Sequence, residues 1–199
     1  FSLTILAQAV GDDFASAVTD TNKWGSDIHA GPGGQLVQTN GQLQFLGTKG
    51  VVRPWIGSFG SYTQDWELTM DVNLGNVALS QDNSQVRIGL SLADLDGWVT
   101  PDGTPLNRMD FGLGLMRISG QTYRGFGAQI FTNDAMAAES VAVTTNQHAS
   151  VRVAFAAGTK TLSTWYDASG DTTAHHWTAL SAQRINTPPI DWGMTNCSG

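Results

Sequence analysis

The sequence is poor in cysteine, in charge and in long apolar runs. Cys197 is the single cysteine among 199 residues, so no disulfide can form within the chain, and a lone thiol near the C-terminus is more typical of a bystander than of a bond between chains. The 10 Lys and Arg do not gather into the basic stripe that nucleic acid or anionic lipid would need, and the formal net charge is −7. No window reaches the ~18 apolar residues of a transmembrane helix.

What is present favours a secreted all-β protein. Hydrophobic residues make up 41% of the chain, charged residues 14%, and there are 23 glycines, while Thr, Ser, Asn and Gln supply most of the polarity. This mixture is typical of short strands and turns, and of proteins that work outside the cell or on its surface. The length predicts one β-sandwich domain over residues 11–190 with a tail over 191–199.

The first ten residues, FSLTILAQAV, allow two interpretations. Ala7–Gln8–Ala9 fits the small-x-small cleavage pattern at the end of a signal peptide. However, Phe1, Leu3 and Ile5 alternate with polar residues, as in a half-buried strand. We prefer the strand, and we expect it to pair within its own domain or to complete the sheet of a neighbouring subunit.

Alternation of apolar and polar residues predicts antiparallel strands along most of the chain. Asn40–Gly41 predicts a type I′ turn of a hairpin in which Leu36 faces Phe45 and Gln38 faces Leu43. One helical turn is expected over 134–139. About ten to twelve strands at this spacing indicate a sandwich or barrel. The remaining expected strands cover residues 66–74, 86–92, 109–116, 125–131, 140–144, 150–155, 161–166 and 177–185.

The order of these segments resembles the concanavalin A-like (laminin-G-like) jelly rolls. The resemblance spans roughly residues 11–185, and its motifs are DDFASAVTDTNKW, GGQLVQTNGQLQFLG, WELTMDVNL, QVRIGLSLAD, RMDFGLGLMR, SVRVAFAAGTKTLSTWYDASGD and WTAL. It implies a two-sheet antiparallel jelly-roll sandwich with a curved concave face. Because that superfamily contains lectins, adhesins, hydrolases and lyases, the fold alone does not identify the function.

A candidate ligand-binding patch appears if the three clearest alternating strands lie in one sheet. Asp and Asn can bind sugar hydroxyls, Arg can orient them, glycines leave room for a ligand, and Trp98 or Trp55 could stack on a ring. A solvated outer sheet face would show the same pattern. The polar face would contain Glu67, Thr69, Asp71, Asn73, Arg87, Gly89, Ser91, Asp110, Gly112 and Gly114.

Catalytic and metal signals are weaker. Glu67 and Asp71 lie four residues apart on one strand, ~13 Å, which is too far for a glycosidase pair, although a cross-strand pair such as Asp71 with Asp110 stays open. Asp94 and Asp96 offer oxygen ligands for calcium in a loop, where ordinary turn chemistry is the simpler interpretation. No cofactor is otherwise indicated.

Three functions therefore remain open. The first is a noncatalytic extracellular protein that binds a glycan or adheres to a surface, with a glycan or another surface polymer as its partner. The second is a structural subunit of an extracellular filament or coat that assembles by donating the strand of Phe1, Leu3 and Ile5 to a neighbour. The third is a carbohydrate-active hydrolase or lyase, which the carboxylate spacing disfavours.

Overall fold

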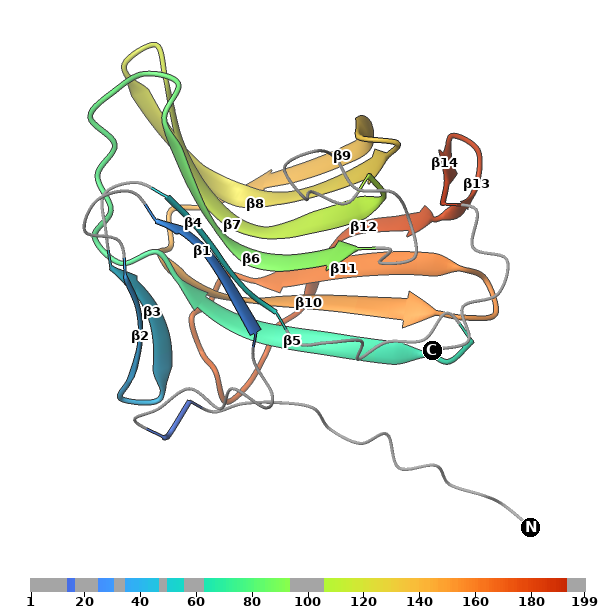
Figure 1. Cartoon of the computed structure of the whole chain (residues 1–199), viewed down its shortest axis with the longest axis horizontal. Coiled ribbons are helices and arrows are strands. Elements are labelled where there is room, and N and C mark those ends of the chain that lie inside the picture. Colours follow the sequence, from blue (N-terminus) through green and yellow to red (C-terminus); the bar gives the residue numbers. More distant parts are fainter. Residues whose placement is uncertain are drawn as a thin grey trace. The chain divides into compact units, whose positions relative to one another are not determined.

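The computed structural model describes residues 14–16, 25–30, 35–46, 50–55, 63–93 and 106–192. Within these ranges the protein is all-β, with fourteen strands and no helix (Figure 1). No stretch of the described residues forms an apolar helix of membrane-spanning length. The strands belong to two compact units, one within residues 1–60 and one within residues 61–198, and each is considered by itself. The single domain expected for residues 11–190 stays a prediction.

The first unit contains two antiparallel strand pairs. In one pair β1 (Gly25–Ala30) runs beside β4 (Gly50–Trp55), and in the other β2 (Gln35–Thr39) runs beside β3 (Gln42–Leu46). The β2–β3 hairpin confirms the turn expected from sequence: Asn40 and Gly41 have φ angles of 50° and 69°. Its register also confirms the pairing of Leu36 with Phe45 and of Gln38 with Leu43.

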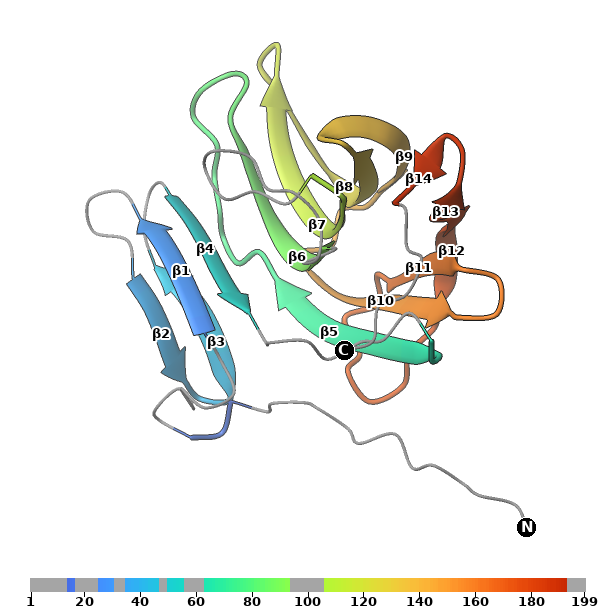
Figure 2. The ribbon, with the colours of Figure 1, turned by 45° about the vertical axis from the view of Figure 1, so that its right-hand side comes forward.

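The second unit contains two four-stranded antiparallel sheets and a short strand pair. The first sheet has the order β12-β11-β10-β5, the second has the order β6-β7-β8-β9, and β13 pairs with β14. Both sheets are visible in Figures 1 and 2. The strand bounds are β5 Trp66–Asn73, β6 Gln85–Ala93, β7 Arg108–Ile118, β8 Gln121–Thr132, β9 Ala135–Val143, β10 His148–Ala156, β11 Thr161–Asp167, β12 Thr178–Arg184, β13 Asn186–Thr187 and β14 Ile190–Asp191.

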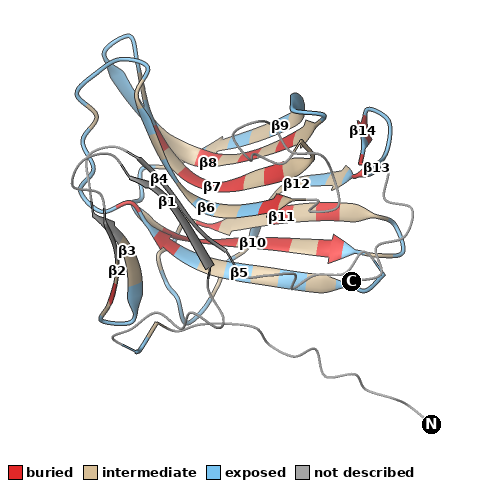
Figure 3. Cartoon of the chain, in the orientation of Figure 1, coloured by how far each residue is buried: buried red, intermediate tan, exposed pale blue. Residues whose placement is uncertain are grey.

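The two sheets of the second unit share one hydrophobic core. Alternate residues of each central strand point into it, and the buried residues lie in bands along β7, β8 and β10 (Figure 3). Phe126 of β8 stacks on Tyr166 of β11, with ring centroids 4.3 Å apart, and so joins the two sheets directly. This arrangement is compatible with a β-sandwich. The fully buried members include Met109, Phe111, Leu113, Val151, Val153, Phe155 and Leu162.

The structure changes two expectations from the sequence. Strand β5 does not join β6 and β7 in one sheet, because it pairs with β10 in the other. The helical turn expected over 134–139 is wrong, because β9 starts at Ala135 and pairs along β8. Asn133 and Asp134 have φ angles of 51° and 62°, so they form a tight two-residue turn that commits the following residues to a hairpin.

Candidate functional site

A row of polar residues crosses the outer face of the β6–β9 sheet, on the side away from the core. The register places Ser91 opposite Asp110, Asp110 opposite Gln129, and Gln129 opposite Glu139, so each strand contributes one residue. Ser91 Oγ donates a hydrogen bond to Asp110 Oδ1 over 2.7 Å. Four neighbouring polar side chains thus form a line that runs perpendicular to the strands.

A second chain of hydrogen bonds reaches this row from β6. Arg87 Nη1 donates to Gln129 Oε1 over 2.8 Å, and Gln129 Nε2 donates to Glu139 Oε1 over 2.7 Å. Both ends of the Gln129 amide are therefore occupied, and its orientation is fixed. To reach Gln129 the Arg87 side chain crosses the sheet and lies over Gly127, where a Cβ atom would be 3.7 Å from Arg87 Nη2.

Arg108 lies beside the row, two residues before Asp110 on β7. Its guanidinium lies 3.8 Å from the centre of the Phe131 ring, its Nη1 is 2.8 Å from Asp134 Oδ1, and its Nε is 3.5 Å from Asp110 Oδ2. The side chain is only 14% exposed, so the cation is held in place by a ring face and two carboxylates. Arg108 and Ser91 thus contact different oxygens of the Asp110 carboxylate, Oδ2 and Oδ1, and together they fix its position.

Five glycines lie beside the row. At only three of them does neighbouring backbone leave no room for a side chain. A Cβ at Gly89 or Gly112 would lie less than 3 Å from the facing strand, and a Cβ at Gly125 would lie 2.5 Å from the Ala142 carbonyl oxygen. A Cβ at Gly114 or Gly127 would make only ordinary contacts, at 3.4 Å and 3.7 Å. Glycine weakens a strand interior, and packing does not demand it at these last two positions, where the floor stays low and only the Arg87 side chain lies over Gly127.

Apolar side chains lie on the other side of these glycines. Tyr123 of β8 faces Met116 of β7, and both are exposed, Tyr123 by 53%. On β9, Val141 faces Gly127 and Val143 faces Gly125, and these valines are 69% and 86% exposed. The floor formed by Gly114 and Gly127 is thus flanked by hydrogen-bonding groups on one side and by apolar groups on the other.

The predicted patch is divided between the two sheets. Arg87 and Asp110 lie in the site just described, whereas Glu67, Asp71 and Asn73 lie on β5 in the opposite sheet. The continuous polar face is therefore absent, because its premise, three strands in one sheet, does not hold.

The β5 residues have structural partners of their own. Glu67 Oε2 pairs with Arg152 Nη2, and Asp71 Oδ1 accepts a hydrogen bond from Ser150 Oγ. Asn73 Oδ1 accepts the Gly75 N–H over 2.8 Å, which is a local turn contact. The cross-strand acid pair of Asp71 with Asp110 is also wrong, because the two residues belong to different sheets.

The remaining predicted residues lie outside the described ranges. These are the ring candidate Trp98, the calcium candidates Asp94 and Asp96, and the strand residues Phe1, Leu3 and Ile5. Within residues 14–192, where described, no three His, Cys, Asp or Glu side chains come together to hold a metal ion. Calcium and strand donation stay predictions.

Sequence reasoning missed Gln129, Glu139 and Tyr123 as site residues. The alternation of β8 was visible, and it would have placed Gln129 and the glycines on one face. The alignment of Gln129 with Asp110 depends on the strand register, which the tight turn at Ser119 and Gly120 sets. Both of these residues have positive φ angles, a signal that the pair Ser-Gly carries only weakly.

The arrangement is suited to binding a polyhydroxylated ligand. Amide, guanidinium and carboxylate groups offer both donors and acceptors, while Tyr123 and the valines offer apolar surface. Asp110 and Glu139 are separated by the whole of β8, which puts their Cα atoms about 10 Å apart at the usual strand spacing. Gln129 lies on the strand between them, where it donates to Glu139 and accepts from Arg87.

Comparison of the chain with protein-family models, with curated proteins and with solved structures finds no significant match. No family is therefore assigned to it, and the resemblance to concanavalin A-like jelly rolls stays an expectation of the sequence.

Proposed function

We propose that this chain is a noncatalytic, extracellular β-sandwich protein that binds a glycan on the outer face of the β6–β9 sheet. The observation that carries the proposal is the low floor of Gly114 and Gly127, where a methyl group would make only ordinary contacts and where the Arg87 side chain lies over Gly127. The two glycines lie between the hydrogen-bonded row of Asp110, Gln129 and Glu139 and the exposed ring of Tyr123.

A sugar chain matches both sides of this floor. Its hydroxyl groups would exchange hydrogen bonds with Gln129, Glu139 and Arg87, whose positions are already fixed by one another. The apolar face of a pyranose would lie against Tyr123. The formal net charge of −7 repels an acidic glycan and so favours a neutral one. We also propose the finer fold assignment, a concanavalin A-like jelly roll, because two antiparallel sheets around one core are compatible with it.

The test is binding of neutral tetrasaccharides: cellotetraose, laminaritetraose, maltotetraose and mannotetraose. We expect the wild-type protein to bind at least one of them in calorimetric titration. The double variant Gly114→Ala/Gly127→Ala should stay folded, because neither methyl group meets a close neighbour, and should lose affinity by at least about tenfold. Asn186→Ala, which changes an exposed residue of β13 outside the β6–β9 sheet, is the control and should bind like the wild type.

Two outcomes would overturn the proposal. One is the absence of binding to all four tetrasaccharides, and the other is unchanged affinity of the double variant. Release of shorter sugars from any of the four tetrasaccharides would instead show that the protein is catalytic, and would favour the hydrolase alternative.

A second candidate function, a subunit of a filament or coat, is favoured by one observation. Strand β9 is an edge strand of its sheet, and Val141 and Val143 leave most of their apolar surface in solvent. Exposed apolar edges are templates for association with other chains. If this function holds, Val143→Lys or deletion of residues 1–8 will reduce the mass of the assembly in analytical ultracentrifugation. A monomeric wild-type protein would contradict it.

A further inference from the structure

A second cluster of aromatic and charged residues lies on the outer face of the opposite sheet. Arg152 of β10 faces Trp165 of β11 in the register, and its guanidinium carbon lies 4.8 Å from the centre of the Trp165 ring. The same carbon lies 5.8 Å from the centre of the Trp177 ring. The cation therefore lies within cation–π distance of two indole rings, one on β11 and one just before β12.

Glu67 completes this cluster from β5. Its carboxylate pairs with Arg152 Nη2, and the two side chains are 48% and 28% exposed. The pair offers donors and acceptors side by side while its charges cancel locally, which suits vicinal hydroxyl groups better than an anion. The exposed Arg–Glu pair contributes little to stability by itself, so folding alone is a weak reason for it.

A shelf of small side chains lies next to this ion pair. Ala154 of β10 is paired with Glu67 on one side and with Ser163 of β11 on the other, and Ser163 is paired with Ala182 of β12. These three small residues occupy the row directly beside that of Arg152 and Trp165. A ring placed on the shelf would meet Trp165 and the Arg152–Glu67 pair along one edge.

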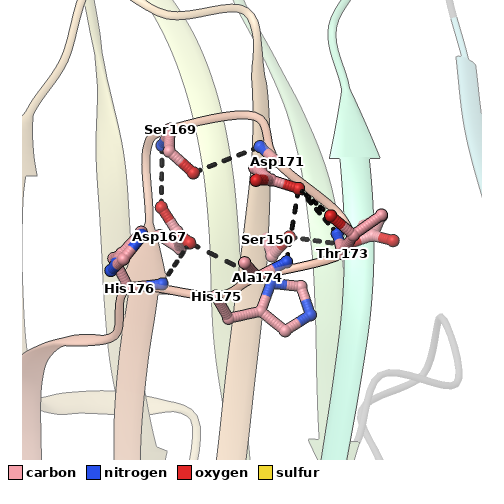
Figure 4. A network of polar contacts seen from close by, with 9 residues as sticks. Ser150, Asp167, Ser169, Asp171, Thr173, Ala174, His175 and His176 are labelled. Atoms are coloured by element: carbon pink, nitrogen blue, oxygen red, sulfur yellow. Dashed lines mark hydrogen bonds and ion pairs between the residues drawn. The ribbon is translucent and has the colours of Figure 1, made fainter.

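The segment that holds Trp177 is fixed by its own polar network (Figure 4). Asp167 accepts hydrogen bonds from the backbone N–H groups of Ser169 and His176, over 2.7 Å and 2.6 Å. Asp171 accepts from the backbone N–H of Thr173 over 2.8 Å and from its hydroxyl over 2.7 Å. His175 lies against Trp177, with ring centroids 4.7 Å apart.

Such anchoring reduces the ordering cost of binding, because Trp177 is held before a ligand arrives. The cluster of Trp165, Arg152 and Trp177 therefore resembles a preformed recognition surface, with polar groups and rings already in place.

We propose that this cluster is a second glycan-binding site, one that takes a neutral pyranose on the shelf of Ala154, Ser163 and Ala182 beside Trp165, Trp177 and Arg152. This second proposal rests on the proposed function only in that both sites are taken to bind a neutral glycan. Since the inner faces of the two sheets share one core, the two sites face away from each other. One chain could then hold two glycan strands at once and cross-link them.

The experiment titrates the same four neutral tetrasaccharides into the full chain and counts the sites. The wild type should bind two equivalents of at least one of them. Ala154→Leu fills the shelf without removing an aromatic ring, and Trp177→Ala removes a ring from a loop rather than from a strand. Each should weaken the second site by at least about tenfold and leave one equivalent. Ala135→Leu adds the same bulk at an exposed position on β9, and this variant should still bind two equivalents of the tetrasaccharide.

Different results would contradict the proposed function and the second site. If the proposed function is wrong but this inference is right, Gly114→Ala/Gly127→Ala will bind like the wild type and Ala154→Leu will abolish binding. If this inference is wrong, the wild type will bind one equivalent or none, and Ala154→Leu will leave that binding unchanged. Cross-linking gives a second readout: a soluble polymer of the bound sugar should precipitate with the wild type and should not precipitate with either single-site variant.

Discussion

Gly89 and Gly112 face each other across β6 and β7 so closely that neither position has room for a side chain. A Cβ on Gly89 would lie 2.5 Å from the Gly112 Cα, and a Cβ on Gly112 would lie 2.7 Å from the Gly89 Cα. The obstacle in each case is backbone, which cannot turn aside as a flexible side chain would. The pairing of β6 with β7, and with it the position of Asp110, depends on both glycines.

Gly112→Ala should therefore destabilise the protein. The added methyl group must push the two strands apart, and forced overpacking of this kind costs roughly 1–3 kcal/mol of the free energy of unfolding. Urea denaturation followed by circular dichroism measures this loss. Gly127→Ala is the control, since its methyl group meets only Arg87 Nη2 at 3.7 Å, and we expect it to be neutral or slightly stabilising. Equal stability of the two variants would show that β6 and β7 can move apart without loss of stability.

The alternation of residues predicted which face of each strand is buried, but not which sheet the strand joins. Val72 of β5 and Met109 of β7 are both buried as expected, because the core lies between the sheets and receives apolar residues from either side. The choice of β10 rather than β6 as the neighbour of β5 is a long-range pairing. Nothing in the local pattern of residues 66–73 encodes it, so the predicted patch combined two faces that point apart.

Local turn chemistry was predictable where glycine or asparagine dominates it, and misleading elsewhere. Asn40–Gly41 gave both the turn and the register of its hairpin. Residues 134–139 contain three alanines and a glutamate, which favour a helix, yet pairing along β8 overrides that preference. The candidate site could be predicted only in part for the same reason. Asp110 and Arg87 follow from alternation, whereas Gln129 and Glu139 join them through register.

Phe126→Ala tests the contact between the two sheets. Phe126 is 1% exposed and stacks on Tyr166, so its loss removes a buried ring and leaves a cavity in the shared core. We expect the free energy of unfolding to fall by about 3–5 kcal/mol. Tyr123→Ala, an exposed aromatic on the same strand, should change it by less than about 0.5 kcal/mol. Thermal denaturation of both variants gives the comparison, and a mild effect of Phe126→Ala would argue against a common core.

Gly41→Val should destabilise the β2–β3 hairpin. Gly41 has a φ angle of 69°, a left-handed conformation that costs a β-branched residue roughly 1–2 kcal/mol. Hydrogen exchange of the amides in residues 35–46 should accelerate, while exchange in β7 and β8 should not change if the first unit opens by itself. Faster exchange in β7 and β8 as well would show that the two units unfold together.

Asp167 makes the stability of the protein dependent on pH below about 4. Its side chain is 3% exposed, and burial raises the pKa of this carboxyl, but the hydrogen bonds from the backbone N–H groups of His176 and Ser169 outweigh burial. The pKa in the folded protein is therefore lower than its ordinary value of 3.8. Because the unfolded chain takes up the proton first, the stabilisation is complete above the unfolded pKa and is lost as the pH falls through the folded pKa.

Asp167→Asn removes the charge from these hydrogen bonds and should lower the free energy of unfolding at pH 7 by about 2 kcal/mol. Urea denaturation at pH 7, 5, 4 and 3 should then show the wild type losing more stability than the variant between pH 4 and pH 3, so that the two curves converge. Asp171, whose pKa the hydroxyl and N–H of Thr173 also lower, titrates in both proteins, so its contribution cancels in the difference. Parallel curves would mean that Asp167 keeps its ordinary pKa and that the segment bearing Trp177 is held by other contacts.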